Sequence, residues 1–254
     1  MASKPIYQFY AELEDYKPKI WRRFQVANNI TMARLGYIIM TMFEMQASHL
    51  FCFDVPIAEN LERDLIKQHD IEFIKRVMAN IGYKENGNWH IELLNEDYED
   101  YRSNNDIKVT DAADSILKYV VSTPKDKMMF NYDYGDNWLI SLVLEKVIID
   151  EELPGKELPR VLEGAGYGII EDCGGTSGLE ALTKAFKKKS GKQYKELSEW
   201  LGRDDLDMAA FDVDDINFRL KKVPRIYADA YEYGLEPTKR SLDLLDRKYL
   251  KKKK

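Results

Sequence analysis

Two short motifs, about forty residues apart, combine carboxylates with glycine and are the strongest candidates for chemistry in this sequence. The first is Tyr-Asp-Tyr-Gly-Asp-Asn-Trp at residues 132–138, and the second is Glu-Asp-Cys-Gly-Gly at residues 171–175. Glycine and aspartate favour tight turns, so each motif is expected to present acidic side chains on a compact backbone. The candidate site residues are Asp133, Gly135, Asp136, Trp138, Glu171, Asp172, Cys173, Gly174 and Gly175.

The carboxylates of the two motifs support two kinds of chemistry if the turns meet in space. They would then hold a hard cation such as Mg²⁺ or Ca²⁺, or act as an acid–base pair. The four side chains concerned are those of Asp133, Asp136, Glu171 and Asp172. Carboxylates of the two motifs within about 5 Å of each other would favour the metal site, because hard cations bind oxygen at roughly 2.0–2.6 Å.

The structural alternative explains the same residues by turn chemistry. Asp133 and Asp136 would bond backbone N–H groups around Gly135, and Asp172 would cap the turn into the next helix. Turn chemistry alone accounts for these residue types, so the sequence favours this interpretation. We therefore expect no metal and no other cofactor.

Other kinds of site have weaker support. Cys173 lies beside two glycines and an expected helix start, which would lower its pKa, but no base lies nearby in sequence. The glycine pair at 174–175 would form an anion nest, yet it lacks the Gly-Lys-Ser/Thr ending of a P-loop. Zinc is disfavoured because the three histidines and two cysteines form no Cys-x-x-Cys or His-x-x-x-His pair. His49 and Cys52 would face opposite sides of an expected strand.

The composition is that of a globular protein with an acidic balance. The chain has 254 residues, 44% of them apolar and 32% charged, with a net charge of -6. That charge opposes non-specific binding to nucleic acid without excluding a specific site. No apolar run approaches the roughly 18 residues of a membrane span, so no membrane association is expected. Two cysteines and an N-terminus without a secretory signal favour a cytoplasmic location.

The elements that must position the two motifs follow from hydrophobic periodicity. Strands are expected at residues 7–14, 20–26, 49–55, 89–94, 128–133 and 138–149, with a tight turn joining the last two. Helices are expected at 32–45, 59–81, 110–120, 176–188, 194–201, 212–220 and 238–249, and loops at 95–105 and 152–175. Trp21, Trp138 and Trp200 are expected to be core anchors. The pattern predicts a single α+β domain over 1–254, with a mixed or antiparallel sheet and a helix-rich C-terminal part.

Five segments in order carry a family resemblance. They are Lys-Pro-Lys-Ile-Trp-Arg-Arg at 17–23, Ser-His-Leu-Phe-Cys-Phe at 48–53, the two acidic motifs, and Trp-Leu-Gly at 200–202 followed by matches at 211–212 and 216–217. Together they resemble the plasmid Ri open-reading-frame-three-like family, also labelled insertion-element passenger TnpR-like proteins. The resemblance spans about residues 5–220 and leaves a C-terminal helical extension at about 221–254. It implies an association with mobile elements, but no assigned reaction.

The sequence also departs from the family pattern. Members often carry a histidine where Ile140 stands, and Cys-Pro-Pro where residues 168–170 are Gly-Ile-Ile. These replacements remove nitrogen and sulfur groups from the expected site. The favoured hypothesis is therefore a non-catalytic binding or accessory protein, whose partner would be a protein or, less in keeping with the net charge, a nucleic acid. The alternative is a metal-assisted hydrolase that uses the four carboxylates of the acidic turns.

Overall fold

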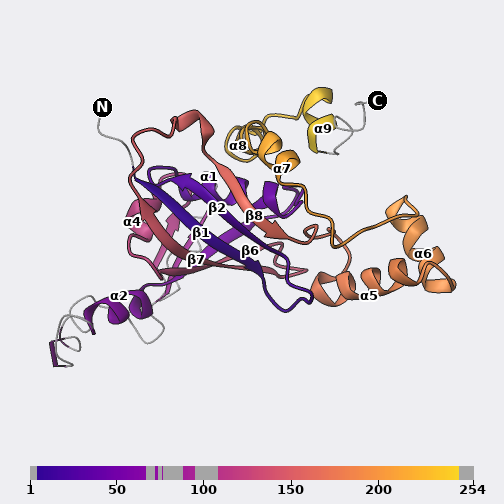
Figure 1. Ribbon diagram of the computed structural model, residues 1–254, viewed down its shortest axis with the longest axis horizontal. Coiled ribbons are helices and arrows are strands. Elements are labelled where there is room, and N and C mark those ends of the chain that lie inside the picture. Colours follow the sequence, from indigo (N-terminus) through magenta and orange to yellow (C-terminus); the bar gives the residue numbers. More distant parts are fainter. Residues whose placement is uncertain (1–4, 67–71, 74–75, 77–87, 95–107, 246–254) are drawn as a thin grey trace.

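A mixed sheet of eight strands forms the centre of the protein, in the order β5-β4-β3-β6-β7-β1-β2-β8 (Figure 1). The computed structural model describes residues 5–66, 72–73, 76, 88–94 and 108–245. The strands are β1 (Ile6–Leu13), β2 (Trp21–Ala27), β3 (Phe51–Pro56), β4 (Asn88–Glu92), β5 (Lys108–Asp111), β6 (Lys127–Tyr132), β7 (Trp138–Ile148) and β8 (Arg160–Ala165). Neighbouring strands are antiparallel except β4 and β5, which are parallel. The expected α+β class with a mixed sheet is confirmed.

Helices cover one face of the sheet and extend from its two ends (Figure 1). They are α1 (Met32–Met42), α2 (Ile57–Leu65), α4 (Leu117–Val120), α5 (Gly175–Lys188), α6 (Lys192–Leu201), α7 (Val213–Leu220), α8 (Val223–Tyr233) and α9 (Lys239–Leu245), with a short 3-10 turn at Gly155–Glu157. Helix α1 lies on the sheet, and α7 and α8 pack against it. Helices α5 and α6 extend from one end of the sheet, and α2 from the other.

Helix α1 is the main apolar element of the core. Thr31 begins it by accepting a hydrogen bond at its side-chain oxygen from the backbone N–H of Arg34, at 3.1 Å. The expected stripe of Leu35, Ile38 and Met42 is fully buried. The helix ends at Met42, three residues before the expected end.

Arg22, in the first family-like segment, joins the sheet to the end of α1. Its guanidinium is fully buried and donates to the carbonyls of Met42, Ala165, Gly166 and Tyr167 at 2.8–3.0 Å. The first of these carbonyls lies in the last turn of α1, the second at the last residue of β8, and the other two directly after that strand. This one side chain therefore fixes the segment that leads into the second acidic motif.

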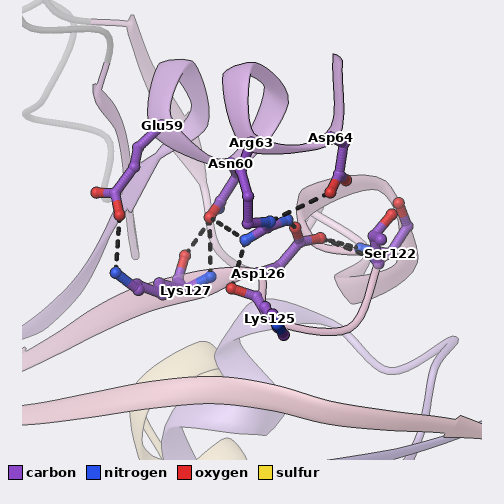
Figure 2. Close-up of polar contacts among 9 residues, drawn as sticks. Glu59, Asn60, Arg63, Asp64, Ser122, Lys125, Asp126 and Lys127 are labelled. Atoms are coloured by element: carbon purple, nitrogen blue, oxygen red, sulfur yellow. Dashed lines mark hydrogen bonds and ion pairs between the residues drawn. The ribbon is translucent and has the colours of Figure 1, made fainter. Parts of the chain in front are cut away.

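A polar cluster attaches α2 to the sheet (Figure 2). The side chain of Asn60 pairs with the backbone N–H and C=O of Lys127, both at 3.0 Å. The carboxylate of Asp126 accepts hydrogen bonds from the backbone N–H groups of Ser122 and Thr123, at 2.7 and 2.8 Å, and pairs with Arg63. Asn60 and Asp126 are both buried, so this cluster satisfies polar groups that water does not reach.

Several expected elements differ from those observed. A helix starting near residue 110 is wrong, because residues 108–111 form β5, whose backbone pairs with β4. The expected loop at 152–175 contains β8, which pairs with β2. Helix α8 lies within the expected helical extension at about 221–254, although its own bounds were not predicted. Trp138 is fully buried as expected, whereas 49% of Trp200 is exposed, so Trp200 is not a core anchor.

Some expectations fall outside the described residues. Helix α2 ends at Leu65, and most of the expected helix to residue 81 lies beyond what the structure describes. The same holds for the expected loop at 95–105. In the described part of the chain, no helix has the length and apolarity needed to cross a membrane.

Candidate functional site

The first acidic motif forms the turn of a hairpin, as expected. Strands β6 and β7 pair antiparallel, with Tyr132 opposite Trp138. Asp133 and Asn137 adopt left-handed backbone angles, with φ of 57° and 53°, which aspartate and asparagine tolerate better than most residues. Oδ1 of Asp133 accepts a hydrogen bond from the backbone N–H of Gly135 at 3.0 Å. This oxygen therefore stabilises the turn and leaves Oδ2 to point elsewhere.

The second acidic motif lies in contact with the first. The backbone N–H of Gly174 donates to Oδ2 of Asp136 at 3.2 Å. A side chain at Gly175 would place its Cβ 2.6 Å from the carbonyl oxygen of Asp136, and the φ of Gly175 is 66°. Only glycine fits there. The two turns thus meet, which was the condition for a shared site, at the ends of two central strands rather than along an edge strand.

Glu171 is the buried anchor of the site. Its Oε1 accepts hydrogen bonds from the backbone N–H of Gln46 and the hydroxyl of Tyr132, both at 2.6 Å. Its Oε2 accepts from the hydroxyl of Ser48 at 2.7 Å. Burial and the neighbouring carboxylate raise the pKa of Tyr132, which keeps its proton on the hydroxyl that donates to Glu171. The arrangement ties the second motif to the segment between α1 and β3.

Helices α7 and α8 hold that same segment from its other side. Arg219 of α7 forms a buried ion pair with Glu44, at 2.7 Å. From α8, the hydroxyl of Tyr227 donates to the carbonyl of Met45 at 2.7 Å, and the hydroxyl of Tyr231 donates to the carbonyl of His49. The backbone around His49 is therefore fixed by two helices and by Glu171.

His49 stands among three carboxylates. Its Nε2 lies 3.6 Å from Oδ2 of Asp133, 3.6 Å from Oδ1 of Asp172 and 4.0 Å from Oε2 of Glu171. One donor atom each from His49, Asp133 and Asp172 lie within 4.8 Å of one another. The imidazole packs edge-on against the ring of Tyr132, with centroids 5.7 Å apart. Asp133 and Glu171 are buried on the inner side of the cluster, and 72% of the Asp172 side chain is exposed.

The structure changes the composition of the expected site. Asp136 bonds the second turn rather than His49, and Asp172 does not cap α5, whose N-cap residue is Gly174. His49 supplies a nitrogen donor that was not among the expected site residues, although it belongs to a family-like segment. Ile140 is fully buried in the sheet opposite Phe130, so the replacement at that position removes nothing from this cluster.

Cys173 does not have the properties of a nucleophile. Burial, followed by the carboxylate of Asp136, raises the pKa of its thiol to about 12, the opposite of the expected effect of a helix start. The thiol lies 3.6 Å from the carbonyl oxygen of Gly175, to which it donates. A thiol in this state is not ionised near neutral pH, and ionisation is what makes cysteine nucleophilic.

Two proteins similar to this chain are described without an assigned function. One is an uncharacterized protein, y4hQ, of Sinorhizobium fredii, which is 31% identical over 103 residues that cover 41% of this chain and 52% of that protein. The match thus spans about half the length of that relative. A protein of unknown function from Methanosarcina mazei Go1 has the same fold, with a TM-score of 0.63 and 22% identity over 84% of this chain and 96% of its own.

The family itself is shown by a match over most of the chain. Residues 5–217 match the plasmid pRiA4b ORF-3-like proteins, and they include both acidic motifs and the segment with His49. The chain therefore belongs to the plasmid pRiA4b ORF-3-like protein family.

Proposed function

We propose that the protein binds a divalent metal ion through His49, Asp133 and Asp172, and that metal-assisted hydrolysis is the chemistry of this site. The observation that carries the proposal is the convergence of these three donors within 4.8 Å of one another. Metal bonds to nitrogen and oxygen ligands are roughly 2.0–2.2 Å long, so two ligands of one ion lie roughly 3–3.5 Å apart. The 3.6 Å separations around His49 are too long for hydrogen bonds and close to this ligand spacing.

The charge at the site supports a cation. Three carboxylates face one imidazole, and no lysine or arginine forms an ion pair with them in the part of the chain that the structure describes. Like charges at this spacing repel one another, and a divalent ion would offset that repulsion. The hydrogen bonds that Tyr132, Ser48 and Gln46 donate to Glu171 would keep a fixed negative charge beside the ion.

The chemistry of the three ligands also limits which metal ion would bind. Imidazole is a ligand for Mn²⁺ and Zn²⁺ and is unusual for Mg²⁺ or Ca²⁺, which prefer oxygen throughout. The exposure of Asp172 leaves one side of the cluster open to solvent. A metal with three protein ligands and an open position binds water and lowers its pKa, which is the basis of metal-assisted hydrolysis.

Thermal melting of metal-free protein with added Mn²⁺ tests the binding. At a concentration one hundred times its Kd, the ion would stabilise the folded form by about 2.7 kcal/mol. That corresponds to a rise of about 5–10 °C in Tm for a chain of this size. Asp172→Asn should remove the rise, because it deletes a ligand. Asp136→Asn is the matched control and should keep the rise, because its carboxylate bonds Gly174 instead.

The hydrolysis is tested separately with the chromogenic diester bis(p-nitrophenyl) phosphate. We expect Mn²⁺-dependent turnover in the parent and in Asp136→Asn, and none in Asp172→Asn. A Tm shift without turnover of this or other activated esters would leave metal binding and reject hydrolysis. A Tm that Mn²⁺ does not change, or a shift that survives in Asp172→Asn, would reject the site.

A non-catalytic accessory protein associated with mobile elements is the second candidate. One observation favours it: Trp200 is half exposed on α6, which extends away from the sheet (Figure 1). Exposed tryptophan is enriched where proteins meet partners. This candidate predicts that Trp200→Ala leaves the Tm unchanged. It also predicts that divalent ions change the Tm of neither the parent protein nor this variant.

A further inference from the structure

A second group of metal-ligating side chains lies on β3 and β4, on the sheet face opposite α1. Cys52 pairs with Glu92 across the two strands, and Asp54 pairs with His90. Residues directly opposite each other in an antiparallel pair project to the same face, so the four side chains lie together. Their neighbours Phe51 and Phe53 project to the other face, into the core under α1.

The contacts within this group join a sulfur, a nitrogen and two carboxylates. Nδ1 of His90 lies 2.8 Å from Oδ1 of Asp54, and its Nε2 lies 3.4 Å from Oε1 of Glu92. Donor atoms of Cys52, Asp54 and His90 all lie within 4.8 Å of one another. The hydroxyl of Tyr134 donates to Oε2 of Glu92 at 3.3 Å and so closes one side of the group.

We propose that Cys52, Asp54 and His90 form a binding site for a thiophilic divalent metal, of which Zn²⁺ is the natural example. Thiolate, imidazole and carboxylate are the three kinds of ligand that zinc takes in proteins. The site is separate from the His49 cluster, which contains no sulfur. It therefore does not depend on the proposed function.

A buried oxygen beside Cys52 supports the site independently. Asn131 lies directly opposite Cys52 on β6, and its side chain therefore projects to the same face. Its Oδ1 is buried and has no hydrogen-bond partner among the residues that the structure describes. A buried acceptor without a partner is costly, and a water bound to a metal would supply the missing donor.

The electrostatics of the group favour a cation. The carboxylates of Asp54 and Glu92 both lie beside the imidazole of His90. A divalent ion would offset the negative charge that the two carboxylates bring together. Asp54 also lines a cavity of about 250 Å³, together with Met129 and Val143.

Titration with Co²⁺ tests this site. Metal-free, full-length protein is kept reduced with a phosphine, and its near-ultraviolet absorbance is followed. A thiolate ligand produces a sulfur-to-cobalt charge-transfer band, which the nitrogen and oxygen donors around His49 cannot produce. We expect the band to saturate when one Co²⁺ is bound at Cys52 in each protein molecule. Cys52→Ser should abolish it, whereas Cys173→Ser, which changes the other cysteine of the chain, should keep it.

Further variants separate this site from the other cluster and from misfolding. Asp172→Asn should leave the charge-transfer band unchanged, even though it removes the effect of Mn²⁺ on Tm. Asp54→Asn and His90→Gln should weaken Co²⁺ binding about tenfold or more. If circular dichroism shows Cys52→Ser to be unfolded, the Co²⁺ affinities of Asp54→Asn and His90→Gln test the site instead. No band at saturating Co²⁺, a band that disappears in Cys173→Ser, or unchanged affinity in Asp54→Asn and His90→Gln would each overturn the proposal.

Discussion

The cluster that attaches α2 and the cluster around His49 use the same kinds of side chain in opposite ways. In the first, Asp126 receives two backbone N–H groups and a guanidinium, so its charge and its oxygens are both satisfied (Figure 2). In the second, Asp133 and Asp172 approach an imidazole at 3.6 Å, which is outside hydrogen-bond distance. In the cluster at α2, other groups of the chain satisfy the hydrogen bonds and the charge of the carboxylate. In the His49 cluster, the negative charge of the carboxylates exceeds the positive charge around them.

The difference separates structural carboxylates from those available to a ligand. A buried carboxylate that accepts several N–H groups contributes to stability, and its loss leaves those groups without partners. A carboxylate that faces other carboxylates costs stability, and such sites are retained where the charge serves a function. Substitution of aspartate by asparagine should therefore have opposite consequences in the two clusters.

The largest effect should come from Asp126→Asn. The amide keeps the shape of the side chain but removes the charge that pairs with Arg63 and places N–H groups against N–H groups. We expect a loss of about 2–4 kcal/mol in the free energy of unfolding. For a chain of this length, Tm would fall by about 5–15 °C. Urea unfolding followed by circular dichroism measures the change.

The matched control is Asp64→Asn, on α2, the helix that carries Arg63. Asp64 also contacts Arg63, at 3.2 Å, but its side chain is 28% exposed. Exposed ion pairs contribute little, so this variant should lose less than about 1 kcal/mol. Equal losses in the two variants would show that the hydrogen bonds from backbone N–H groups to Asp126 are not what stabilises the cluster.

Glu171→Gln should have an intermediate effect on stability. Glu171 accepts several hydrogen bonds, as a structural carboxylate does, and it also lies beside the other carboxylates around His49. Glutamine can keep its oxygen facing Gln46 and Tyr132 and can donate from its amide to Ser48, so we expect a loss of about 1–2 kcal/mol. It also removes a charge beside His49. Changes to groups that support metal ligands typically cost 10–100-fold in affinity. The Mn²⁺-induced rise in Tm should therefore persist but require a higher ion concentration. Complete loss of the rise would make Glu171 a ligand itself.

Local sequence signals predicted the parts of the site that depend on local geometry. The hairpin at 132–138 follows from alternating strands around glycine, and α1 follows from its apolar stripe and the Thr31 cap. Strand β8 lacked such a signal because its backbone, including Gly164, is defined by pairing with β2. A Cβ at Gly164 would lie 2.6 Å from the carbonyl oxygen of Trp21. That requirement arises from tertiary structure and leaves no periodic pattern in the chain.

His49 was missed for a related reason. Its partners Asp133 and Asp172 are far away in sequence, and the sequence did not predict that α8 would fix its backbone through Tyr231. Spacing rules detect metal sites whose ligands share one helix or loop. They do not detect metal ligands that come from three separate parts of the chain. Here these parts are the β6–β7 turn, the segment between α1 and β3, and the segment before α5. Cys52 and His90 escaped the same rules because they lie on different strands.

The smallest effect distinguishes the two clusters most sharply, because its sign is reversed. Without metal, Asp172→Asn should stabilise the protein by roughly 0.2–0.5 kcal/mol. The substitution removes repulsion between carboxylates, and asparagine tolerates the φ of 57° at this position as well as aspartate does. Urea unfolding of metal-free parent and variant measures it, with Asp136→Asn as the control that should lose stability. If Asp172→Asn is destabilised as Asp126→Asn is, then the His49 cluster is a satisfied structural network and the distinction between the two regions is wrong.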